Sequence, residues 1–320
     1  MKMLKDKKFS GDFVFINDEE SLFATVSRNS VYVYSFETKN TILKVKTLSN
    51  AVYAAISPDK NLLAVKNTSG TLALIDMVSG EEVCRDVMER TEGEPMFFTS
   101  SGKYVIDLDW GGRTILFDCN LKSHSILDNT RPLIRCEYIQ YDRFTRKIYR
   151  FMAKDFGNSP GIIQTTTLDE NHLTPEYVAY DTVQHFDKEL PDHMHGLSFC
   201  SVHNYWYDFK NGKIVQFDKN FNKIDSINLP KINTVTKAQK IWVSPNENYL
   251  FIEYGRQSDV FKETVSEMKL APSLSVLYDM KTMCVVKEFS YDYVSSFTMC
   301  NDDRCYIIGT WNGTFLGEIK

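Results

Sequence analysis

The 320-residue sequence lacks the features that mark several classes of protein. Its first stretch, MKMLKDKKFSGDF, is charged and has no apolar core like that of a secretory signal, and no window approaches the roughly 18 uninterrupted apolar residues of a membrane-spanning helix. Basic residues are not in excess, because 37 Lys and Arg stand against 42 Asp and Glu. A nucleic-acid binder needs such an excess to neutralise phosphates. We therefore expect a cytoplasmic protein with no membrane and no nucleic-acid partner.

The cysteines form no pattern that indicates a zinc or redox motif. There are seven of them, they are widely scattered, and no C-x-x-C pair occurs. Cys200 lies near several histidines in the sequence and is a conceivable nucleophile, but a reactive thiol needs surroundings that lower its pKa. We expect most cysteines to be small, buried and reduced, and we expect no metal and no other cofactor.

What the sequence does contain is a repeat. Seven times, apolar stretches alternate with polar turns in the same order, and the middle turn is rich in Gly or Asn, as in SRNSVYVYSF, NTSGTLALID, DWGGRTILFD, FKNGKIVQFD and TWNGTFLGEI. Gly and Asn suit the positive φ of a tight hairpin. The second apolar stretches recur roughly 40 to 57 residues apart, at Leu22, Leu62, Tyr104, Ile148, Tyr205, Tyr249 and Cys305.

This period, with four strands in each unit, predicts an all-β fold. The expected architecture is a seven-bladed β-propeller of four-stranded antiparallel blades, forming a single domain over 1–320. The stretches are apolar on both faces, as expected for blades covered on each side by a neighbour. The last unit, from Val294, has only three strands, so we expect residues 1–9 to add its fourth and close the ring. The expected units are 13–46, 52–87, 95–127, 135–180, 196–229, 239–289 and 294–319 plus 1–9.

Four third strands end in an apolar residue followed by aspartate, at Ile75-Asp76, Phe117-Asp118, Phe217-Asp218 and Tyr278-Asp279. Together with LALIDMVSGEEV, this pattern resembles a degenerate WD-repeat. Asp is physically suited to that position because its carboxylate can cap the turn through an Asx-type hydrogen bond. The stretches SPDKNLLAV and SPNENYLFI are equally similar to repeats of the bacterial seven-bladed β-propeller superfamily, which includes lactonases. Both resemblances imply the propeller fold, and neither assigns a function.

The largest insertions favour one face of the expected propeller. Turns between the second and third strands, and connections between blades, open on this face, and the insertions at 154–160, 181–196 and 255–273 all fall there. Long loops are costly to order without a use, so we interpret this as the binding face, with neutral drift of insertions as the alternative. The apolar spacing within 255–273 also predicts a short amphipathic helix.

Seven residues of this face are candidates for binding. Trp and Arg are favoured anchors in protein interfaces, and the loop at 181–196 is dense in potential metal ligands. We expect its histidines to be solvated or hydrogen-bonded rather than bound to a metal. The candidates are Arg28, Trp110, His185, His193, His195, Arg256 and Trp311.

These observations favour a non-catalytic binding scaffold that recognises a protein or peptide on its loop-rich face. The alternative is a hydrolase or lactonase-like propeller enzyme with its pocket at the mouth of the central channel. A third possibility is a ligand-sensing domain. The sequence contains no G-x-S-x-G, P-loop, H-E-x-x-H or G-x-G-x-x-G motif. The enzyme alternative stays open, because propeller enzymes assemble catalytic residues from different blades.

Overall fold

The structure is a computed structural model that describes residues 6–319 except 12, 89–92, 110–112, 129–134, 154–160, 181–197, 201, 211–212, 220–221, 231–236, 256–272 and 292–293. The described residues form 28 β-strands in seven four-stranded antiparallel sheets. This part of the chain contains no helix long and apolar enough to cross a membrane. The prediction of a seven-bladed β-propeller is confirmed. The insertions at 154–160 and 181–196 lie outside the described residues, as do residues 256–272 of the insertion at 255–273, where a helix was expected.

Each blade is named here by its place in the chain, and its strands are a, b, c and d in sheet order. Blade 1 consists of β2 (Phe13–Ile16), β3 (Leu22–Ser27), β4 (Ser30–Ser35) and β5 (Thr41–Lys46). Blade 2 consists of β6 (Ala51–Ile56), β7 (Leu62–Asn67), β8 (Thr71–Asp76) and β9 (Glu82–Val87). Blade 3 consists of β10 (Gly93–Phe98), β11 (Tyr104–Asp109), β12 (Thr114–Asp118) and β13 (Ser123–Asp128). Blade 4 consists of β14 (Arg135–Asp142), β15 (Lys147–Ala153), β16 (Gly161–Thr167) and β17 (Glu176–Tyr180).

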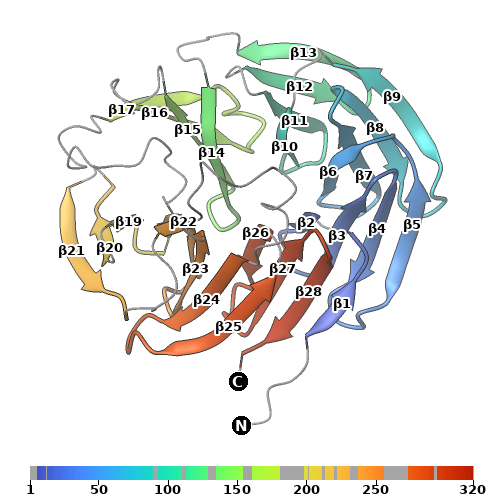
Figure 1. The fold of residues 1–320 in the computed structure, drawn as a ribbon. Helices are drawn as coiled ribbons and strands as arrows, with labels where there is room; N and C mark the ends of the chain where they lie inside the picture. The colour runs from blue at the N-terminus through green and yellow to red at the C-terminus, as the bar shows by residue number, and fades with distance from the viewer. Residues whose placement is uncertain are drawn as a thin grey trace, which may run out of the picture. The chain divides into compact units, whose positions relative to one another are not determined.

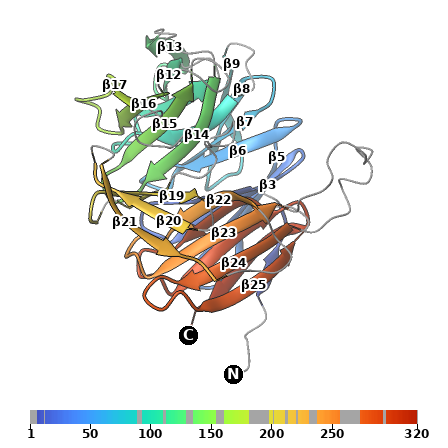
Figure 2. The same cartoon turned by 60° about the vertical axis from the view of Figure 1, so that its left-hand side comes forward.

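The remaining blades follow the same plan. Blade 5 consists of β18 (Ser198–Cys200), β19 (Tyr205–Lys210), β20 (Lys213–Phe217) and β21 (Lys223–Asn228). Blade 6 consists of β22 (Lys237–Val243), β23 (Tyr249–Gly255), β24 (Ser273–Asp279) and β25 (Val285–Tyr291), which lie side by side in this order in Figure 2. Blade 7 consists of β26 (Val294–Met299), β27 (Cys305–Thr310), β28 (Gly313–Glu318) and β1 (Lys7–Phe9). In every blade the a–b and c–d turns lie at one end of the sheet and the b–c turn lies at the other, because the strands alternate in direction.

The chain divides into two compact units. Unit 2 spans Ser10–Thr182 and contains blades 1 to 4. Apolar side chains of facing blades form its cores: Val33 and Leu63 belong to the cluster between blades 1 and 2, and Leu72 and Phe117 to the cluster between blades 2 and 3. These side chains are fully buried, which is the main stabilising contribution to such a fold. Burial on both faces explains why the strands read as continuous apolar stretches.

Unit 1 consists of Met1–Phe9 and Val183–Lys320 and contains blades 5 to 7. Strand β1 pairs antiparallel with β28 and completes blade 7, as expected from the missing fourth strand (Figure 1). Asp6, just before β1, accepts hydrogen bonds from Tyr306 Oη at 2.8 Å and from Lys287 Nζ at 2.7 Å. Gly317 makes room for this contact, because a Cβ there would lie 2.1 Å from Tyr306 Oη.

The turns follow rules that repeat from blade to blade. The predicted Asx-type caps are present: Asp76 Oδ1 accepts the Ser79 N–H at 2.7 Å, and Asp279 Oδ1 accepts the Thr282 N–H at 2.8 Å. These bonds hold the pKa of both aspartates below the ordinary value. Every a–b turn also has a residue with positive φ shortly before strand b: Glu20, Lys60, Gly102, Arg146, Asn204, Glu247 and Asp303.

Candidate functional site

Two of the predicted binding residues lie in the described part of the chain, both in b–c turns. Arg28 is exposed in the two-residue turn of blade 1, with φ of 55°, and its carbonyl accepts the N–H of Ala51 at 2.8 Å. Trp311 lies in the b–c turn of blade 7 and is 58% exposed. These two residues belong to different units. The other candidates, Trp110, His185, His193, His195 and Arg256, fall outside the described residues.

A second group of chemically capable side chains lies in the a–b turns of blades 5 and 6. Cys200 ends strand β18, and His203 follows it in the turn that leads to β19. Glu247 has the positive φ, here 58°, in the turn between β22 and β23. In blades 2 and 7 the equivalent side chains, Lys60 and Asp303, also contact the turn of the preceding blade. The fold thus directs the Glu247 carboxylate toward blade 5.

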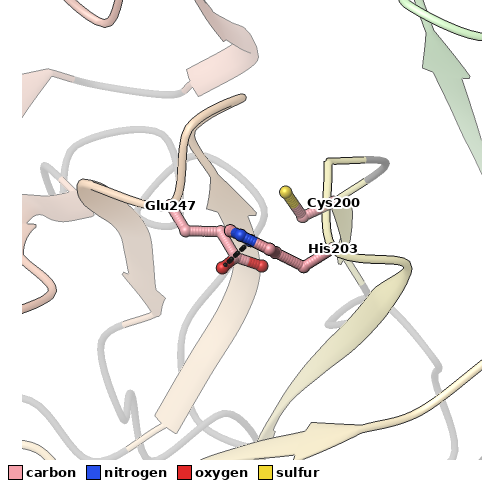
Figure 3. A group of neighbouring side chains, drawn as sticks. All are labelled: Cys200, His203 and Glu247. Carbon is pink, nitrogen blue, oxygen red and sulfur yellow. Dashed lines mark hydrogen bonds and ion pairs between the residues drawn. The ribbon is translucent and has the colours of Figure 1, made fainter.

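The three side chains converge in Figure 3. Their sulfur, imidazole and carboxylate ligand atoms all lie within 4.8 Å of one another. His203 Nδ1 and Glu247 Oε2 are 2.6 Å apart, and the Cys200 thiol donates to the carbonyl oxygen of Pro245 at 3.3 Å. Cys200 is buried, whereas His203 is half exposed, so the group has a protein side and a solvent side.

Further hydrogen bonds hold Glu247 in place. Tyr207 Oη donates to Glu247 Oε1 at 2.8 Å, and Gln216 Nε2 donates to Tyr207 Oη at 2.9 Å. Burial and the Glu247 carboxylate raise the pKa of the Tyr207 hydroxyl, so this hydroxyl stays protonated and acts as a donor to the carboxylate. These bonds occupy one carboxylate oxygen and leave the other directed at His203.

The turn that carries Glu247 is also tied to blade 7. Ser244 Oγ donates to Asp303 Oδ2 at 2.8 Å, Asn248 Nδ2 donates to the same oxygen at 3.0 Å, and Asn246 Nδ2 donates to the carbonyl of Asn301 at 2.6 Å. The residues on both sides of Glu247 are therefore bonded to a neighbouring sheet. Such support limits the movement of the Glu247 side chain.

The surroundings of Cys200 disfavour nucleophilic chemistry. Burial and the nearby Glu247 carboxylate raise the pKa of the thiol to about 12, so the thiolate is scarce at neutral pH. The same three side chains, thiol, imidazole and carboxylate, are the types that hold Zn²⁺ in proteins. A bound cation would favour the thiolate by displacing its proton, so the three side chains form a possible ligand set.

Unit 2 has a different carboxylate centre in its a–b turns. Asp18 of blade 1 accepts a hydrogen bond from Tyr141 Oη at 2.7 Å and pairs with Arg146 Nη1 at 2.5 Å. Nearby, Arg143 pairs with Glu20 at 3.0 Å. A pocket of about 80 Å³ adjoins this centre. Its lining includes Phe15, Asp18, Phe97, Phe98, Tyr141 and Arg146. Its volume is well below the roughly 300 Å³ at which pockets for drug-sized ligands begin.

Cys200 was a candidate from the sequence, whereas His203 and Glu247 were not. An alignment of the a–b turns would have indicated Glu247, because the side chain at the equivalent position contacts the preceding turn in blades 2 and 7. The disulfide between Cys300 and Cys305, which joins the two ends of the a–b turn of blade 7, was not predicted.

Comparisons with known proteins support the fold alone. No family model matches the chain, and no curated protein matches it. Among solved structures, the chain is similar to hydrazine synthase from Kuenenia stuttgartiensis, with a TM-score of 0.66 and 11% sequence identity over 99% of this chain and 98% of that one. At this identity the likeness extends to the fold, and chemistry cannot be transferred by it.

Proposed function

We propose that the protein is a non-catalytic propeller, related to WD-repeat-like scaffolds, that binds another protein or a peptide through its b–c turns. Trp311 carries this proposal, because a tryptophan with 58% of its surface exposed is a large apolar group available for burial by a partner. The exposed b–c position of Arg28 in blade 1 supports the same type of surface. Both side-chain types are favoured anchors.

The backbone around Trp311 is fixed. Thr310 Oγ1 donates to the carbonyl of Gly313 at 2.8 Å and accepts the N–H of Asn312 at 3.1 Å. Gly313 has φ of 121°, and a Cβ there would lie 2.7 Å from the Phe9 carbonyl oxygen. A held backbone lowers the entropy that binding would otherwise cost.

The neighbouring charge indicates the chemistry of the partner. Strand β1 runs along this edge of blade 7, and both Lys7 and Lys8 are exposed. A Cβ at Gly313 would lie 3.1 Å from Lys8 Cε, so this lysine side chain lies beside the Trp311 turn. A peptide with an apolar side chain followed by a carboxylate would complement such a surface.

Selection from a phage-displayed random peptide library against the immobilised protein tests the proposal. We expect peptides that combine apolar and acidic residues, and we expect Trp311→Ala to weaken their binding by about 2 kcal/mol, or roughly 30-fold. Matched controls are Phe144→Ala and Val78→Ala, which truncate exposed apolar side chains in an a–b and a c–d turn. Loss of binding in these controls with full binding by Trp311→Ala would show that the wrong turns were chosen. A library without binders would reject peptide recognition.

A further inference from the structure

We propose that Cys200 Sγ, His203 Nδ1 and Glu247 Oε2 bind one Zn²⁺ ion that links the a–b turns of blades 5 and 6. The three atoms come from the three side-chain types that zinc sites use, and they already lie within 4.8 Å of one another. They belong to turns separated in sequence, so their convergence results from the fold. A metal there would connect two blades.

The present contacts show how the ion would enter. His203 Nδ1 and Glu247 Oε2 lie 2.6 Å apart, and Zn²⁺ would take the place of the hydrogen bond between them, with the neutral imidazole keeping its single proton by moving it from Nδ1 to Nε2. The imidazole then carries its proton on Nε2, on a ring that is half exposed to solvent. The Cys200 thiol gives up its proton to solvent and ligates as the thiolate. Charge and atoms therefore balance with the release of one proton for each ion bound.

The outer contacts match those of established zinc sites. Ligating carboxylates in proteins are themselves hydrogen-bonded, and such partners orient the ligand. Here Tyr207 Oη binds Glu247 Oε1, and Gln216 in turn binds Tyr207. The second oxygen of Glu247 is left for the ion. Three protein ligands converge among the described residues and His203 borders solvent, so a water molecule would take the fourth position.

Other cysteine and histidine groups of the described residues provide controls. His124 Nδ1 and Asp86 Oδ2 also lie 2.6 Å apart and join blades 2 and 3, which makes His124→Gln a matched control for a His–carboxylate pair. Cys284 is an exposed free thiol, and its change to Ser removes adventitious thiolate binding. Cys300 and Cys305 are joined by a disulfide, so the titration is done without a thiol reductant.

The test is a titration of the tag-free full chain with Co²⁺ as a spectroscopic probe, followed by displacement with Zn²⁺. We expect one equivalent of Co²⁺ to produce a thiolate-to-cobalt charge-transfer band and the intense visible absorption of four-coordinate cobalt. Cys200→Ser should remove the charge-transfer band, and His203→Gln and Glu247→Gln should each weaken binding by roughly tenfold or more. His124→Gln and Cys284→Ser should bind like the wild type.

Two outcomes would overturn the proposal. One is a wild-type protein without a charge-transfer band, and the other is a band that survives Cys200→Ser but disappears with Cys284→Ser. Because Cys200 is buried, that variant is first checked for folding by circular dichroism. If it does not fold, His203→Gln decides the question, since this half-exposed side chain can be replaced without disturbing the core. Unchanged cobalt affinity and spectrum in His203→Gln would then reject the site.

Discussion

The a–b turns of the two units each hold a carboxylate that accepts a hydrogen bond from tyrosine and pairs with a basic side chain, but the basic side chains differ. In unit 2, Asp18 is bonded to Tyr141 and Arg146. In unit 1, Glu247 is bonded to Tyr207 and His203, and a buried thiol lies beside them. The same kind of turn therefore presents two chemically different centres.

The chemistry of the two basic side chains gives the two centres different roles. Arginine is always charged, offers several fixed N–H donors and has no lone pair for a metal, so the Asp18 centre is a structural ion pair. Histidine can exchange a proton for a metal ion, and the Cys200 thiol adds a soft ligand. The Glu247 centre thus differs from the Asp18 centre by having histidine in place of arginine and one additional sulfur ligand.

The largest expected difference between the two centres is in stability. Asp18→Asn removes the negative charge that pairs with Arg146. It also removes a negative charge near Arg143, whose side chain is only 11% exposed. We expect it to lower the free energy of unfolding by about 2 kcal/mol. Glu247→Gln in the metal-free protein should cost about 1 kcal/mol or less, because His203 is half exposed. Urea denaturation measures both.

The control for these variants is Asp302→Asn, whose carboxylate pairs with the exposed Arg304 at 3.8 Å. Its effect should stay within about 0.5 kcal/mol. If Glu247→Gln in metal-free protein costs as much as Asp18→Asn, the contrast between a structural and a ligand centre is wrong.

The tyrosines give a smaller and more specific comparison. Tyr141→Phe and Tyr207→Phe each remove one hydroxyl bonded to a turn carboxylate and should each cost about 1 kcal/mol. Only Tyr207→Phe should also lower zinc affinity, by roughly tenfold, because it frees a carboxylate oriented toward the metal. Thermal unfolding with and without added Zn²⁺ separates the two effects. An equal zinc response in both variants would contradict the role given to Tyr207.

Most of the fold was predictable because it depends on local patterns that repeat. The Gly- or Asn-containing turns, the period of the apolar stretches and the missing strand of the last unit predicted seven blades and the closing strand β1. The Asp76 and Asp279 caps were predictable for the same reason, since each bond spans only a few residues. Patterns of this kind are visible in a single chain.

The candidate site was not predictable to the same extent. Glu247 and His203 are far apart in sequence, and their contact depends on which turn lies beside which and on a positive φ that Glu does not indicate by its type. In the sequence, the density of potential metal ligands indicated His185, His193 and His195 instead, and these residues lie outside the described part of the chain. For Trp311, the pattern predicted the turn but not the exposure of 58%, which depends on how neighbouring strands cover the ring.

The smallest expected effect is the loss of stability when a turn carboxylate that accepts hydrogen bonds from neutral donors is removed. Glu170, in the c–d turn of blade 4, accepts the Ser101 N–H at 2.8 Å and the Ser101 hydroxyl at 2.7 Å. Partial burial opposes ionisation, but these bonds, together with one from Thr99, outweigh it and lower the pKa of Glu170 to about 2. Because the folded-state pKa lies below the ordinary value of 4.5, the stabilisation is present above pH 4.5 and is lost as the pH falls toward 2.

Since the contact between Glu170 and Ser101 is near solvent, we expect Glu170→Gln to lower the free energy of unfolding by about 1 kcal/mol or less at pH 7. The difference in melting temperature from the wild type should shrink by pH 3, whereas the exposed control Glu81→Gln should show little difference at either pH. A difference that stays constant between pH 7 and pH 3 would show that packing of the side chain, and not its charge, stabilises the contact between blades 3 and 4.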